Sequence, residues 1–153
     1  MVLSCYNPMP SNVHFINKEG VELFQIGKDK AGSCTYDTVF IKDNNSVAVS
    51  SGDGDKRCIA MIGIESNEII TPIFMDTNIY GMAVRGRTIY YCTRNKGLKM
   101  LNLSDKSLSD INSEMSGFNY VATFGDKLKL HKLYHTFRDM LRFTWYNTMG
   151  IQR

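Results

Sequence analysis

The amino-acid sequence predicts an all-β protein, and three observations support this prediction. Its apolar segments are short and rich in β-branched and aromatic residues, as in TVFI at 38–41 and TIYYC at 88–92. Clusters of turn-forming residues separate these segments, such as the Asp-Asn-Asn at 43–45. The arrangement of segments and turns also recurs along the chain. With 153 residues, 43% of them hydrophobic and 22% charged, the chain is long enough to bury a core in one domain.

The recurring unit holds four predicted strands in 40 to 44 residues. Residues 36–73 form one copy and residues 80–111 form the next, while residues 12–26 match only the second half of the unit. The pattern begins again at residue 120, so that Tyr36, Tyr80 and Tyr120 recur at the repeat period and are expected to pack one unit against the next. Such a period is typical of a β-propeller, whose four-stranded blades surround an axis. A β-sandwich with evenly spaced strands is the alternative.

The number of copies predicts only part of a propeller. Residues 1–128 hold a trailing half-blade, two complete blades and the start of another, whereas closed propellers typically have 4 to 8 blades. The sequence therefore predicts a propeller fragment, or a chain that must assemble with something else. Exposed blade edges would favour self-association.

Three strings carry a resemblance to a known family: SVAVSSG followed by CIAMIGIESNEIITPI, then YGMAVRGRTIYYCTRNKGLKMLNLSDKSLSDI, then NYVATFGDKL. They resemble the NHL-repeat propeller of tripartite-motif proteins, especially the expanded molluscan group, as a truncated copy. In that family the propeller follows a RING and B-box region and is the substrate- or RNA-binding end of a ubiquitin ligase. RING and B-box domains need closely spaced Cys and His zinc ligands. Four scattered cysteines and three histidines cannot supply them, so this chain alone is expected to lack ligase activity.

The segment 129–153 departs from the repeat and is treated as an atypical tail. Apolar residues follow a helical spacing with basic residues between them, which predicts an amphipathic helix, at Leu130, Leu133, Tyr134, Phe137 and Leu141. His131 and His135 have a metal-chelating spacing, but no third ligand lies near them and surface histidines are the simpler interpretation. A competing hypothesis is a frameshift that truncated a longer propeller, since a one-nucleotide shift permits a strand–turn–strand sequence here.

A basic rim is the candidate ligand-binding site. In a propeller, the loops between second and third strands emerge on the same face as the connections between blades, and here these loops are SGDGDKR (51–57) and TRNKG (93–97). The rim residues are Lys28, Lys30, Lys56, Arg57, Arg94 and Lys96. They could hold RNA phosphates or an acidic peptide, although solvated loop charges are the simpler interpretation. Asp53 and Asp55 interrupt the rim, and their spacing indicates a turn, not a calcium loop.

The sequence contains no recognisable catalytic, cofactor or metal motif, which predicts a non-catalytic module that binds a protein or single-stranded RNA. A fragment of a propeller hydrolase and a truncated product without function are the alternatives. Tyr90 and Tyr91 are expected to pack in the core and not to stack on bases. The dispersed cysteines, the absence of a signal sequence and the lack of an apolar run of about 20 residues predict a cytoplasmic chain with no membrane contact.

Overall fold

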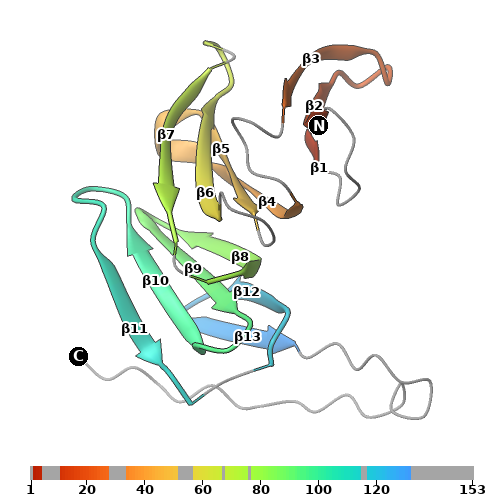
Figure 1. The fold of residues 1–153 in the computed structure, drawn as a ribbon. Coiled ribbons are helices and arrows are strands. Elements are labelled where there is room, and N and C mark those ends of the chain that lie inside the picture. The colour runs from red at the N-terminus through yellow and green to blue at the C-terminus, as the bar shows by residue number, and fades with distance from the viewer. Residues whose placement is uncertain are drawn as a thin grey trace.

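The structure is a computed structural model, and it describes residues 2–4, 11–27, 34–51, 57–66, 68–75, 77–114 and 117–131. Within these residues the chain forms four antiparallel sheets, which follow one another in chain order (Figure 1). The first sheet contains β1 (Val2–Ser4), β2 (Ser11–Ile16) and β3 (Glu22–Gly27). The fourth sheet contains β12 (Tyr120–Phe124) and β13 (Lys127–His131).

The second and third sheets are complete four-stranded units. The second contains β4 (Thr35–Ile41), β5 (Ser46–Ser51), β6 (Cys58–Gly63) and β7 (Ile69–Phe74), with the short 3-10 helix η1 (Lys42–Asn44) in its first turn. The third contains β8 (Ile79–Arg85), β9 (Thr88–Thr93), β10 (Leu98–Asn102) and β11 (Leu108–Asn112). In both sheets each strand pairs with its chain neighbour, so the two repeats predicted at 36–73 and 80–111 are confirmed as equivalent four-stranded meanders.

The first strands of successive sheets lie side by side. β4 contacts β8, and β8 contacts β12. Each second strand also contacts the first strand of the following sheet, as β5 does with β8 and β9 with β12. β1 contacts β4 in the same way. We therefore assign β1 to the second position of the first sheet, a strand that the sequence repeat did not predict.

Three apolar clusters fill the spaces between successive sheets. Val13, Phe15 and Ile26 of the first sheet pack against Val47 and Val49 of the second. The largest cluster joins the second and third sheets, with Ile41, Ala48, Ile59, Met61, Ile79, Met82, Ile89, Tyr91 and Leu101. A third cluster joins the third and fourth sheets, with Ala83, Cys92, Leu98, Val121 and Leu128. Strands β5 and β6 of the second sheet are buried along their whole length, and β8 and β9 of the third sheet over most of theirs, which explains their runs of consecutive apolar residues.

A polar link accompanies the apolar contact between the second and third sheets. The Met82 amide donates a hydrogen bond of 2.7 Å to the Asp37 carboxylate, and the Ser50 hydroxyl donates one of 2.8 Å to the Tyr80 carbonyl. Burial raises the pKa of Asp37, while the backbone hydrogen bonds from Met82 and Thr38 oppose that rise. The link satisfies backbone groups of β8 where the strand approaches β4.

The prediction that three repeated tyrosines occupy equivalent places holds only for the first two. The rings of Tyr36 and Tyr80 meet edge to face, with centroids 4.8 Å apart. Tyr120 does not occupy the equivalent place. The two-residue turns that end β8 and β12 are equivalent, so that Arg85 corresponds to Phe124. Counting back four residues from each of these positions aligns Tyr120 with Gly81. A sequence period counts residues and therefore misses the bulge that β8 makes between Ile79 and Met82.

The predicted tail begins inside a strand. β13 runs to His131, so Leu130 and His131 extend the last hairpin and do not begin a helix. Residues 132–153 lie outside the described residues, and with them the remainder of the predicted helix, His135 and the frameshift hypothesis. Among the described residues, no helix has the length and apolar character needed to cross a bilayer.

Candidate functional site

The loop from Thr93 to Gly97 holds two of the predicted rim residues in a fixed turn. The Thr93 hydroxyl donates to the Gly97 carbonyl at 2.9 Å and accepts from the Lys96 amide at 3.0 Å. The Thr93 amide also donates to the Gly97 carbonyl at 3.0 Å. Thr93 is only 1% exposed. These bonds fix the backbone of the loop, while the side chains of Arg94 and Lys96 are exposed.

Only glycine fits at position 97. Its φ of +76° lies in the left-handed region, which other residues rarely adopt. A Cβ there would also lie 2.8 Å from the Ser113 Cα and would overlap the Asn112 carbonyl oxygen. The end of the loop is therefore packed against the backbone that follows β11. The position of the two basic side chains is thus set by both the turn and its contact with the sheet edge.

The connection between the second and third sheets joins this loop to Arg57. The Met75 amide donates to the Arg57 carbonyl at 2.9 Å, and the Arg94 amide donates to the Asn78 carbonyl at 3.2 Å. Thr77 and Asn78 are each 9% exposed, so this connection is itself packed into the protein. The structure thus places Arg57 and Arg94 at the same end of the two sheets, in the loops between the second and third strands, as the sequence predicted.

Arg57 is the least exposed of the described rim residues. Its side chain is half-buried, and its Nε atom is buried without a hydrogen-bond partner among the described residues. A buried guanidinium donor is stabilised by an acceptor, because leaving such a group unpaired typically costs about 1–3 kcal/mol. Arg57 therefore provides a donor and a positive charge beside the exposed cations of the neighbouring loop.

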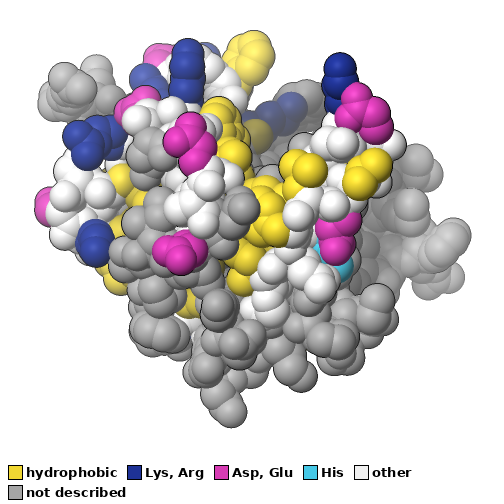
Figure 2. Space-filling model, turned by 90° about the horizontal axis from the view of Figure 1, so that it is seen from above, with side chains coloured by type: hydrophobic (Ala, Val, Ile, Leu, Met, Phe, Trp, Pro, Cys, Tyr) yellow, Lys and Arg dark blue, Asp and Glu magenta, His cyan; other side chains and the backbone are white. Residues whose placement is uncertain are grey.

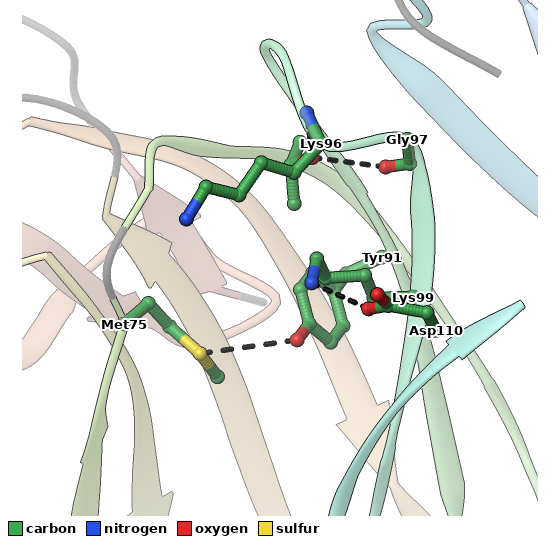
Figure 3. Close-up of polar contacts among 7 residues, drawn as sticks. Met75, Tyr91, Lys96, Gly97, Lys99 and Asp110 are labelled. Carbon is green, nitrogen blue, oxygen red and sulfur yellow. Dashed lines mark hydrogen bonds and ion pairs between the residues drawn. The ribbon is translucent and has the colours of Figure 1, made fainter. Parts of the chain in front are cut away.

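Lys96 extends away from its own loop. Figure 3 shows its side chain reaching across the space above Met75 and Tyr91, in the direction of the second sheet. Lys99, two residues beyond the loop, forms an ion pair with Asp110 and is thereby engaged within the third sheet. Of the six predicted rim residues the structure describes Arg57, Arg94 and Lys96, and from here on the word rim means the basic surface that these three form.

The tyrosines near the rim are structural. Tyr91 is 1% exposed and its hydroxyl contacts the Met75 sulfur at 3.9 Å (Figure 3). Tyr90 is half-buried against the cluster between the third and fourth sheets. The prediction that both pack in the core is confirmed.

The other predicted rim residues are not placed by the structure. Lys28, Lys30 and Lys56 lie outside the described residues, as do Asp53 and Asp55. Among the residues that are described, no group of three acidic, His or Cys side chains could hold a metal ion. Sequence reasoning missed Thr93 and Asn78. Thr93 carried a local signal, since a threonine four residues before a glycine can close a turn through its hydroxyl.

The fold agrees with solved structures. No protein-family model and no curated protein matches the sequence. The structure titled "Structure of U3-55K" superimposes with a TM-score of 0.60 at 15% identity, over 79% of this chain and 42% of that chain. U3-55K is a WD40 β-propeller. This chain forms a partial β-propeller.

At 15% identity the likeness shows the fold alone. In propeller terms, the four sheets are successive blades and β4, β8 and β12 are their inner strands. The chain spans less than half the length of U3-55K.

Proposed function

We propose that this partial propeller is a non-catalytic module that binds a protein partner, and that the rim recognises an acidic segment of that partner. Propellers of this kind commonly act as protein-interaction modules, and the propeller fold supports such a role here. The observation that carries the proposal is the rim itself. Arg94 and Lys96 are exposed on a hydrogen-bonded loop, and Arg57 is tied to the same inter-blade connection.

The chemistry of the rim favours carboxylates. Arginine offers several donors in a planar arrangement that matches a carboxylate, whereas lysine acts as a mobile point charge. The half-buried side chain of Arg57 adds a positive charge beside these two cations. A protein that binds single-stranded RNA usually offers exposed aromatic rings on which the bases stack. Tyr90 and Tyr91, the aromatic residues nearest the rim loop in sequence, are half-buried and buried respectively. Because neither of these rings is fully exposed for stacking, an acidic protein segment is favoured over RNA.

The resemblance of residues 12–128 to the NHL-repeat propeller supports a finer proposal. The module would then correspond to the substrate-recognition end of a tripartite-motif ubiquitin ligase, acting in the cytoplasm. This relationship would make the acidic segment part of a substrate protein.

The test uses a short fluorescent peptide rich in Asp and Glu, with a single-stranded oligo(U) RNA of similar charge in parallel. We expect the peptide to bind, and the double variant Arg94→Glu/Lys96→Glu to lose at least about tenfold in affinity, since reversal replaces attraction with repulsion. Arg85→Glu/Arg87→Glu is the matched control, because these exposed arginines lie at the opposite end of β9.

Two outcomes would overturn the proposal. Equal losses in the rim variant and the control would mean that only net charge matters. Tight RNA binding that is lost in the rim variant and falls steeply between about 50 and 200 mM salt, without peptide binding, would assign the rim to nucleic acid.

A further inference from the structure

The cations of the rim lie on two neighbouring sheets. Arg57 directly precedes β6 of the second sheet, whereas Arg94 and Lys96 belong to the loop between β9 and β10 of the third. Lys96 also extends from its own loop in the direction of the second sheet (Figure 3). A ligand that contacts all three cations must therefore cross from one sheet to the next, and its anionic groups must match the distance between the sheets.

The connection between the two sheets sets that distance. Its first residue, Met75, donates its amide to the Arg57 carbonyl, and the carbonyl of its last residue, Asn78, accepts from the Arg94 amide. An extended chain advances about 3.3–3.6 Å per residue, so the three steps from Met75 to Asn78 span at most about 11 Å. Sheets that pack face to face lie about 10 Å apart. We therefore take the two arginine positions to be roughly 10 Å apart along the rim.

The described part of the rim is basic and lacks an apolar surface. The loop Thr93–Gly97 carries two cations and no acidic residue, and none of the large apolar side chains that are exposed among the described residues belongs to the rim. At the opposite end of the sheets, which Figure 2 views, basic and acidic side chains are interspersed. An amphipathic helix docks through its apolar face. The rim therefore suits an extended acidic segment better than a helical one.

Extended conformations differ in the spacing of side chains that share a face. Polyproline II has three residues per turn and a rise of 3.1 Å, so side chains at positions i and i+3 point the same way and lie about 9 Å apart. In a β-strand the side chains at i and i+2 share a face at only about 7 Å, and the side chain at i+3 points away. Of these spacings, the one found in polyproline II matches the distance between the two arginines.

We propose that the rim recognises an acidic segment in the polyproline II conformation, with one carboxylate at Arg57 and a second carboxylate, three residues along the segment, at Arg94 and Lys96. The inference rests on the proposed function, and it names the form of the partner segment that the rim accepts. Polyproline II is already populated in unfolded acidic chains, so such a segment loses little conformational freedom when it binds.

The test compares three capped, proline-rich peptides of equal length. The first has two glutamates three residues apart, the second has two glutamates two residues apart, and the third has one glutamate with a glutamine three residues along. Binding to the full chain is followed through the amide chemical shifts of the isotope-labelled protein. We expect the first peptide to bind about three- to fivefold more tightly than either of the others, the gain from one partly exposed ion pair. The Arg57 and Arg94 amides should both shift on binding.

Arg57→Gln should remove this preference, because the first peptide would then bind no better than the peptide with one glutamate. Arg85→Gln is the matched control. It changes an exposed arginine at the other end of the sheets and should leave the preference intact. The comparison of the two spacings on the unmodified chain decides the inference even if Arg57→Gln does not fold.

Equal affinity for the two spacings would overturn the inference and leave the proposed function in place. So would an unchanged preference in Arg57→Gln, or binding of the Asp- and Glu-rich peptide without binding of the proline-rich ones. If no acidic peptide binds, the proposed function is wrong and the inference falls with it.

Discussion

Gly81 provides a sharp test of how closely the inner strands approach one another. A Cβ at this position would lie 2.6 Å from the Asn119 carbonyl oxygen and 2.6 Å from the Tyr120 Cα. Both atoms belong to the backbone at the start of the fourth sheet, so no side chain can rotate away to make room. Gly81→Ala is therefore expected to push β12 from β8 and to disturb the apolar cluster between the third and fourth sheets.

The expected size of the effect follows from this geometry. Ordinary contact begins near 3.4 Å, so the strands must separate by roughly 0.8 Å, and inserting one methyl group into a packed site costs about 1–3 kcal/mol. Gly81 does not have a positive φ, so alanine also restricts the unfolded chain and recovers about 0.4–1 kcal/mol. We expect a net loss of about 1–2 kcal/mol in the free energy of unfolding, and a fall in Tm of roughly 3–8 °C.

Urea denaturation followed by circular dichroism measures this loss. Gly86→Asn is the matched control in the same sheet. Gly86 has a φ of +54°, a Cβ added there would meet no atom within 4 Å, and asparagine tolerates that conformation. The control should change the free energy of unfolding by less than about 0.5 kcal/mol. A Gly81→Ala protein as stable as the unmodified chain, or more stable, would refute the close approach of β8 and β12.

Three further predictions follow from the polar and thiol groups. The raised pKa of Asp37 means that its contribution to stability is complete below its ordinary pKa of 3.8 and is lost as the pH rises through the folded-state pKa. As the pH rises over that range, the free energy of unfolding of Asp37→Asn should fall less than that of the unmodified protein. Parallel curves of unfolding free energy against pH would contradict this. Thr93→Val removes two hydrogen bonds of the rim loop, and should lower the free energy of unfolding by about 1–2 kcal/mol and weaken binding of the acidic peptide. Iodoacetamide should modify the half-buried Cys34 before Cys92, whose pKa is raised to about 12 by burial and by the nearby Asp37 charge, as peptide mass spectrometry can measure.

Much of the fold could be predicted because it is encoded locally. The strands of the second and third sheets are marked by β-branched runs, and their turns by residues that favour turns. The period of these signals was enough to identify two equivalent sheets. β1 escaped prediction because Val2–Ser4 is too short to show any alternation. The alignment of Tyr120 failed because a bulge changes the number of residues without changing the position of the strand in the sheet.

The rim was predicted in outline but not in its construction. The loops that carry Arg57 and Arg94 could be assigned to one face from topology alone. The hydrogen bonds that join both loops to the connection at Met75–Asn78 depend on the packing of two sheets, which no local pattern reports. The need for glycine at position 81 has the same origin. It follows from the distance between β8 and β12, not from the turn chemistry by which glycines are usually interpreted.

The arrangement of inner strands is the central claim, and a nuclear Overhauser experiment on the isotope-labelled chain tests it most directly. The structure places the backbone of Gly81 against the Asn119–Tyr120 backbone, and the Asp37 carboxylate against the Met82 amide. We predict cross-peaks between the Gly81 and Tyr120 α-protons, and between the Asp37 β-protons and the Met82 amide proton. Their absence in a folded chain, with cross-peaks joining the second and fourth sheets face to face instead, would contradict the propeller arrangement.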